Sequence, residues 1–167
     1  MRALGEKEIR ASFVNCSKGE ARRLSLPADF TGTPWSDLDF LGWRDPKAPD
    51  RGYAVTERDG ELVGIALRAS TGARRSALKS SFCSVCVTPQ AGSGITLLVA
   101  PRAGEAGRQG NTVGLYICAD LACSLYVRGK KQSALARRFE ESLTLEEQNE
   151  RTTRNLNGFL DQVLGQA

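Results

Sequence analysis

Two pairs of cysteines are the residues of this sequence whose type and spacing could do chemistry. Cys83 and Cys86 are separated by two residues, Cys118 and Cys123 by four, and 31 residues lie between the pairs. A two-residue gap lets both thiolates of a tight turn face one metal ion, and four soft thiolates suit tetrahedral zinc. The pattern predicts one zinc ion bound by all four cysteines.

The cysteines also allow other interpretations. A thioredoxin-like redox motif would need a βαβ context, which is missing around Cys83, and it would not explain the second pair. An iron–sulfur cluster and a set of small buried thiols stay open as alternatives. The chain has five cysteines, and we expect the remaining one, Cys16, to be a core thiol on the first helix.

The sequence contains no histidine, so the commonest general base and the commonest ligand of catalytic zinc are both absent. Four cysteines would also fill the open position that catalytic zinc keeps for water. Zinc deaminases need H-x-E or C-x-E ahead of P-C-x-x-C, whereas Cys83 follows Phe82 and Cys16 precedes Ser17-Lys18. We therefore predict a structural zinc and no enzymatic activity or small-molecule substrate, with a hidden open zinc site as the alternative.

The composition bounds the class of protein. The chain has 167 residues, of which 41% are hydrophobic, enough to fill the core of one domain or a small two-part domain. It contains no apolar run long enough to span a membrane and no apolar signal core at its start, so we expect a cytoplasmic protein without membrane contact. The net charge of +4 permits contact with RNA, the ribosome or an acidic protein without requiring any of them.

The elements around the cysteines predict how they come together. Apolar runs at 95–100 and 112–117 form a hairpin, and the glycine-rich loop 101–111 between them is a candidate flexible, functional segment. Cys118 ends the second strand, and Cys123 falls in the first turns of a short helix that carries 124–127 and ends near Gly129. A knuckle, then a hairpin, then a helix is the layout of a treble-clef finger.

The first half of the chain is expected to mix helices and strands. Helices are predicted over 6–16 and, after a capping box at Ser17, over 18–25. The proline-rich stretch 27–52 is expected to be irregular, with one strand near 40–44. A hairpin over 53–68 turns at Asp59-Gly60.

The later segments complete the expected fold. A polar, basic linker is predicted over 69–80 and a helix over 134–142. A final helix follows a capping box at Thr144, and its apolar stripe is expected to pack in the core. The predicted class is α+β, with small antiparallel β-hairpins, a treble-clef zinc finger and flanking helices. Residues 1–80 are expected to form an α/β segment packed on the finger domain, residues 81–167.

Several stretches resemble a known family. Residues 110–131 (GNTVGLYICADLACSLYVRGKK) resemble the C-terminal treble-clef domain of elongation-factor-G-binding proteins, the FusB-type fusidic-acid-resistance proteins and their actinobacterial relatives. Residues 9–21 (IRASFVNCSKGEA) and 39–46 (DFLGWRDP) resemble the actinobacterial members. The resemblance covers roughly residues 6–165.

The resemblance implies a protein that binds elongation factor G through its finger domain, with the four cysteines as zinc ligands. In the resistance proteins this binding frees the factor from drug-stalled ribosomes. Only about 80 residues precede Cys83, so the separate N-terminal helical bundle of those proteins is not expected here, and drug resistance is implied less directly than factor binding. Aromatic and basic residues near the finger are the partner-binding candidates: Phe82, Tyr116, Tyr126, Arg128, Lys130 and Lys131.

A second function stays open. Basic residues at 74–79 and 128–138 could bind the phosphates of RNA or the ribosome, with Tyr126 or Phe82 stacking on bases. Binding through phosphates should weaken steeply as salt is added, and a largely apolar protein interface should weaken much less.

Overall fold

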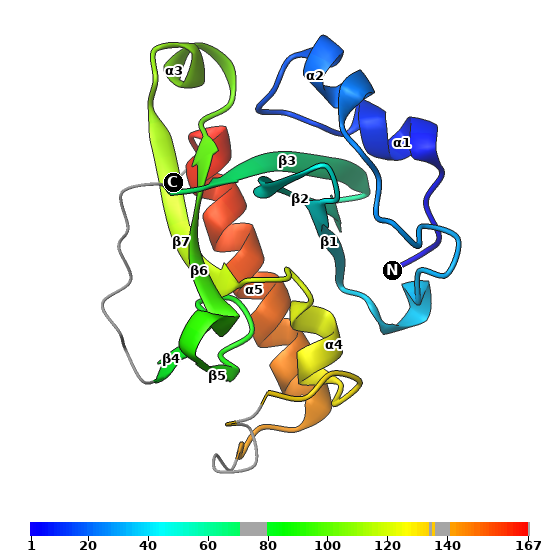
Figure 1. Ribbon diagram of the computed structural model, residues 1–167, viewed down its shortest axis with the longest axis vertical. Helices are drawn as coiled ribbons and strands as arrows, with labels where there is room; N and C mark the ends of the chain where they lie inside the picture. The colour runs from blue at the N-terminus through cyan, green and yellow to red at the C-terminus, as the bar shows by residue number, and fades with distance from the viewer. Residues whose placement is uncertain (71–79, 134, 136–140, 167) are drawn as a thin grey trace.

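The computed structural model describes residues 1–70, 80–133, 135 and 141–166, and within them a five-stranded antiparallel sheet forms the centre of the fold (Figure 1). The strand order is β1-β2-β3-β6-β7. A separate ribbon pairs β4 with β5. The strands are β1 (Phe40–Asp45), β2 (Ala48–Arg58), β3 (Glu61–Ala69), β4 (Ser80–Phe82), β5 (Pro89–Ala91), β6 (Ile95–Pro101) and β7 (Thr112–Cys118).

The hairpin predicted over 53–68 is confirmed as β2 and β3. Asp59 and Gly60 form its turn with φ of 52° and 82°, the left-handed backbone that an Asp-Gly pair adopts most readily in a two-residue hairpin. The strand β2 begins at Ala48, earlier than expected, because it also pairs with β1 on its other side. Part of the proline-rich stretch is therefore strand rather than irregular chain.

The short helices are α1 (Glu6–Ala11), α2 (Lys18–Arg23), α3 (Gly104–Arg108) and α4 (Cys123–Val127), with 3₁₀ turns at Trp35–Asp37 and Gly92–Gly94. The prediction that the first helix reaches residue 16 is wrong. The amide of Val14 donates to the carbonyl of Gly64, and the amide of Gly64 donates to the carbonyl of Ser12. Sheet-like bonds thus replace the next helical turn, and Cys16 lies half-buried in the connection to α2 rather than on a helix.

The final helix, α5 (Leu145–Leu164), confirms the capping box. The Thr144 hydroxyl accepts from the amide of Glu147, whose carboxylate accepts from the amide of Thr144. The expected apolar stripe is buried in the core, except for the half-buried Leu164: Leu156, Phe159, Leu160 and Val163. Among the described residues, no helix is long and apolar enough to cross a membrane.

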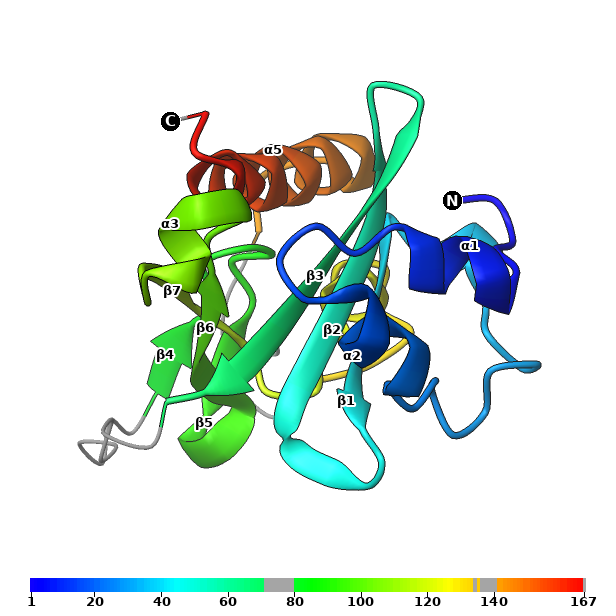
Figure 2. The same cartoon turned by 90° about the horizontal axis from the view of Figure 1, so that it is seen from above.

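The sheet carries a core on each of its faces. Neighbouring strand residues point to opposite faces, so Phe40 and Ala54 pack with α5 and the cysteines, whereas Leu41 and Val55 pack with Ile9 of α1. Figure 2 shows α5 on one side of β2 and β3, with α1 and α2 on the other. The four cysteines belong to the core on the α5 side.

A short stretch of pairing joins the two hairpins into one sheet. Arg68 and Ala69 of β3 pair with Val99 and Leu98 of β6. The hairpin of the first 80 residues thus shares the sheet and the core of the finger's own hairpin. The division into segments 1–80 and 81–167 stays a prediction.

The loop between β6 and β7 has regular structure and a hydrogen bond to α5. It contains α3, and the amide of Ala103 donates to the carbonyl of Val163 in α5 over 2.7 Å. Its suggested flexibility stays a prediction. Most of the linker predicted over 69–80 and most of the helix predicted over 134–142 lie outside the described residues.

Candidate metal centre

The four cysteine sulfurs lie together in the core. Cys83 Sγ is 3.7 Å from Cys123 Sγ, and Cys86 Sγ is 3.6 Å from Cys118 Sγ. All four ligand atoms lie within 4.8 Å of one another, and all four side chains are buried. A tetrahedral zinc with Zn–S bonds of about 2.3 Å separates its sulfurs by about 3.8 Å. The donor set and its spacing therefore fit one zinc ion.

Each pair of cysteines is presented by a tight turn. Cys83 and Cys86 lie in the turn between β4 and β5, and the amide of Val87 donates to the carbonyl of Cys83. Val87 has a φ of 61°, a left-handed backbone that is rare for a β-branched residue. A turn this tight brings both sulfurs of the first pair to one side.

The second pair follows the predicted order. Cys118 is the last residue of β7, and Cys123 is the first residue of α4. The connection between them also passes through a left-handed residue, Leu121, with a φ of 60°. The expected knuckle, hairpin and helix are thus confirmed.

Polar groups surround the sulfurs at hydrogen-bond distance. The amides of Val85 and Cys86 donate to Cys83 Sγ over 3.3 and 3.4 Å. Thr88 Oγ1 lies 3.3 Å from Cys86 Sγ, and the buried Gln90 amide donates to Cys118 Sγ over 3.8 Å. Such contacts orient ligands and spread the negative charge of thiolates. The cysteine spacing alone did not indicate Thr88 or Gln90.

The four buried thiols need a positive charge between them in order to ionise together. Hydrogen bonds from the neighbouring thiols, Cys118 first, lower the pKa of Cys83, whereas burial raises the pKa of Cys123. Buried thiols so close to one another cannot all ionise without a positive charge between them. A zinc ion would supply that charge, and four sulfurs would leave it no open position for substrate. The zinc's role in this site is to fix the fold.

Close backbone packing ties the metal site to the sheet. Gly42 of β1 faces the carbonyl of Leu121, and Gly52 of β2 faces the Leu121 side chain. A Cβ atom at Gly42 would lie only 2.6 Å from that carbonyl oxygen. The loop between Cys118 and Cys123 therefore packs closely against the glycines of β1 and β2.

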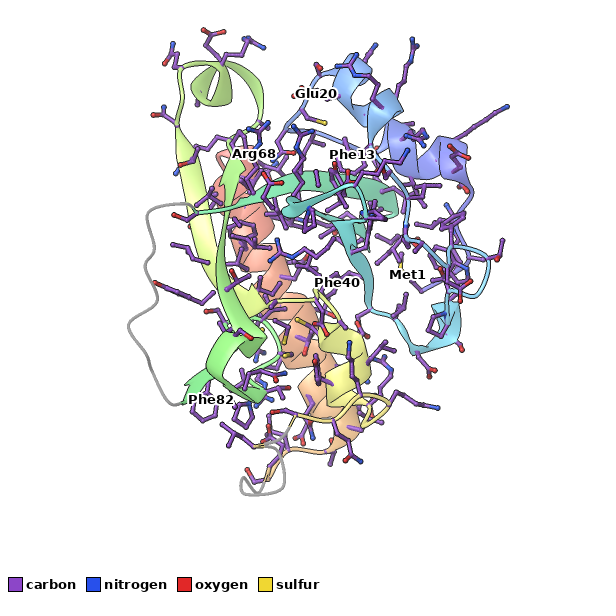
Figure 3. All side chains as sticks on the ribbon, viewed as in Figure 1. Met1, Phe13, Glu20, Phe40, Arg68 and Phe82 are labelled. Carbon is purple, nitrogen blue, oxygen red and sulfur yellow. The ribbon has the colours of Figure 1, made fainter. Side chains whose placement is uncertain are left out.

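The structure places two of the partner-binding candidates on the surface beside the metal site. Phe82 and Tyr116 are 47% and 55% exposed. The amide of Ser84, in the first knuckle, donates to the carbonyl of Tyr116 over 2.8 Å, which joins the knuckle to β7. Phe82 lies at the lower end of the molecule in Figure 3.

The other four candidates lie in or after α4, at its contacts with acidic residues. Arg128 makes two bonds to the Asp39 carboxylate over 2.6 and 2.8 Å, and both side chains are largely enclosed. Lys130 lies 3.8 Å from Asp37. Arg128 thus fastens the end of α4 to the entry of β1, a contact that no local sequence signal indicated.

Asp120 contacts both of the remaining candidates, Tyr126 and Lys131. Its carboxylate accepts from the Tyr126 hydroxyl over 3.0 Å and pairs with Lys131. The Lys131 ammonium also lies 5.7 Å from the centre of the Tyr126 ring. Burial, then the nearby Asp120 charge, raises the pKa of Tyr126, so its hydroxyl is neutral and donates.

A closed four-cysteine site held by a knuckle, a hairpin and a helix defines a treble-clef zinc finger. A model of the FBP C-terminal treble-clef zinc-finger family matches residues 8–163, and the chain belongs to this family. The match includes both hairpins and nearly all of α5. The description of the family, a treble-clef zinc finger, agrees with the four-cysteine site.

Comparison with solved structures finds a similar chain in the structure of the fusidic acid resistance protein FusC, with a TM-score of 0.48 and 17% sequence identity. The match covers 85% of this chain and 51% of that one, so this chain spans about half the length of FusC. No curated protein matches the chain.

Proposed function

We propose that this chain is a non-enzymatic zinc-finger protein that binds the translation elongation factor G in the cytoplasm and modulates its release from the ribosome. The observation that carries the proposal is the family match over residues 8–163. The resemblance of residues 110–131 to elongation-factor-G-binding proteins supports the same partner.

The surface proposed for the contact is centred on Phe82 and Tyr116. In the part of the chain that the structure describes, the large hydrophobic side chains with substantial exposure are these two and Leu145. Exposed aromatic side chains bury much area at little entropic cost, and they are common at the centres of protein interfaces. Zinc supports this surface because Phe82, the last residue of β4, directly precedes the ligand Cys83, and Tyr116 lies in β7, which ends at the ligand Cys118.

Basic side chains extend the proposed surface. Lys130 and Lys131 are exposed at the end of α4, where they can steer an acidic partner toward the rings. Tyr126 and Arg128 contribute by position, because their contacts with Asp120 and Asp39 hold the segment that carries both lysines.

The proposal is tested by isothermal titration of the purified chain with elongation factor G. Phe82→Ala with Tyr116→Ala should weaken binding about 30-fold or more, as expected when two interface aromatics are lost. Leu145→Ala is the matched control, since it removes an equally exposed apolar side chain, 50% exposed, at the start of α5. Zinc content and thermal melting of each variant show whether its fold is kept.

Three outcomes count against the proposal. Elongation factor G fails to bind, the double variant binds as well as the wild type, or the control weakens equally. Binding to ribosomal RNA alone, with a steep loss as salt is added, would support an RNA- or ribosome-binding function instead.

A further inference from the structure

A cleft of about 720 Å³ opens at the end of the molecule away from Phe82, and the zinc finger does not account for it. It is lined by α2, the segment before α2, the paired ends of β2 and β3, and the start of the loop that carries α3. Figure 1 shows α2 and α3 at the same end of the fold. Figure 3 places Arg68 and Glu20 in this region.

Arginines dominate the charge of this cleft. Its lining contains Arg23, Arg51, Arg68, Arg102 and Arg108, against the carboxylates of Glu20 and Asp45. Arg108 pairs with Glu105. Among the residues that the structure describes, the other four arginines make no ion pair.

The two carboxylates of the cleft also accept hydrogen bonds from neutral groups. Glu20 accepts from the amide and the hydroxyl of Ser17, in the capping box of α2. Asp45 accepts from the amide of Lys47 and from the hydroxyl of the buried Tyr53. Both keep their negative charge, and the pKa of Glu20 is lowered first by its bonds from Ser17 and then by the nearby charges of Arg68 and Arg23. Two carboxylates nevertheless leave positive charge in excess among the arginines of the cleft.

Two of these arginines are exposed and lie side by side in the sheet. Arg51 and Arg68 are directly opposite each other in the β2–β3 ladder, so their side chains leave the same face of the sheet. Like charges in directly opposed positions destabilise a strand pair. An anion held between them would convert the repulsion into attraction.

The cleft is held in shape by the side chain of the half-buried Asn15. The Asn15 side chain accepts from the amide of Ala66 and donates to the carbonyls of Ala66 and Pro101, over 2.8 to 3.0 Å. This link fixes the segment before α2 to both β3 and the end of β6. The base of the cleft is therefore set before any ligand arrives.

We propose that this cleft binds a small phosphate-bearing molecule of nucleotide size, with adjacent phosphates held by Arg51, Arg68 and Arg102. Guanidinium groups match phosphate oxygens in paired hydrogen bonds, and several of them favour a ligand with several closely spaced oxyanions over a single carboxylate. The volume lies in the range of small-ligand sites. Apolar lining from Val14, Leu24 and Leu67 offers contact to the organic part.

Cys16 also lines the cleft, and burial raises the pKa of its thiol to about 11. The thiol is therefore neutral near pH 7 and does not repel an anion. A neutral thiol is also a poor nucleophile, so the cleft is a binding site rather than a site of cysteine chemistry.

Isothermal titration with inorganic pyrophosphate and with ATP tests the proposal on the full chain. Both probes should bind the wild type saturably and weaken as salt is added. Arg51→Gln combined with Arg68→Gln should weaken binding about 10-fold or more, since two charged hydrogen-bond donors are lost. Arg22→Gln, on the same helix α2 but outside the cleft, should leave binding unchanged within about twofold.

A melting curve without ligand separates folding from binding. The double variant should melt no lower than the wild type, because the repulsion between two opposed arginines has been removed. The proposal is overturned if neither probe binds saturably, if Arg22→Gln weakens binding as much as the double variant, or if the double variant binds normally. It is also overturned if a short single-stranded RNA or an oligoglutamate peptide binds this cleft about tenfold more tightly than pyrophosphate. None of these outcomes depends on elongation factor G.

Discussion

The contact between Gly42 and the loop of the second cysteine pair leads to a sharp prediction. In Gly42→Ala, the new Cβ atom would lie 2.6 Å from the carbonyl oxygen of Leu121, whereas ordinary contact begins at 3.4 Å. The loop or the strand must therefore move by about 0.8 Å, and the metal ligands at both ends of the loop resist that movement. Overpacking a rigid site costs about 1–3 kcal/mol, and we expect the upper end here because the obstacle is backbone.

For a chain of this length, a loss of about 3 kcal/mol corresponds to a melting temperature about 6–12 °C lower. Calorimetry of the zinc-loaded protein measures this shift, and a chromophoric chelator should remove zinc faster from the variant. Gly158→Ala is the matched control, since a Cβ there meets nothing within 4 Å and alanine in the middle of α5 should add about 1 kcal/mol. The reasoning is refuted if Gly42→Ala melts at or above the wild type, or if both variants shift in the same direction.

Three further predictions concern the metal site and its attachment. The purified chain should carry one zinc by metal analysis. Cys118→Ser should lose both zinc and the near-ultraviolet circular dichroism of a folded core, because zinc binding supplies about 10–16 kcal/mol of folding free energy. A folded, zinc-loaded variant would contradict this. Val87→Gly should be neutral or stabilising by about 1 kcal/mol, since it relieves the left-handed backbone of a valine. Val85→Gly should cost about 3 kcal/mol because it empties a buried position. Urea denaturation distinguishes the two variants, and equal losses of stability would refute the idea that Val87 is strained. Arg128→Ala should lower the free energy of unfolding by about 1–3 kcal/mol, because it leaves the enclosed Asp39 carboxylate unpaired. Adding Asp39→Ala should recover part of that loss in a double-mutant cycle. Simple additivity of the two losses would show that the pair does not couple.

Features with local causes could be predicted from the sequence. The β2–β3 turn follows from Asp59-Gly60, because that pair takes the left-handed backbone of a two-residue turn with little strain. The start of α5 follows from Thr144, whose hydroxyl caps a helix amide three residues on. The choice of four cysteines as zinc ligands follows from their spacing and from the hairpin between them.

Features with non-local causes could not be predicted. The first helix ends early because Val14 and Ser12 find partners on Gly64, about 50 residues along the chain. That pairing moves Cys16 out of the expected helix and into the wall of the cleft. The Arg128–Asp39 pair likewise joins residues 89 positions apart.

The sequence by itself determined the chemistry of this protein: four thiolate donors, no histidine, and the turns and caps that set each element. Those properties depend on residue type and on neighbours within a few positions. Tertiary structure alone decided that β3 pairs with β6, that Gly42 supports the zinc loop, and that Arg51 and Arg68 face one cleft. These contacts join distant segments through packing and strand register, which the order of residues along the chain does not encode locally.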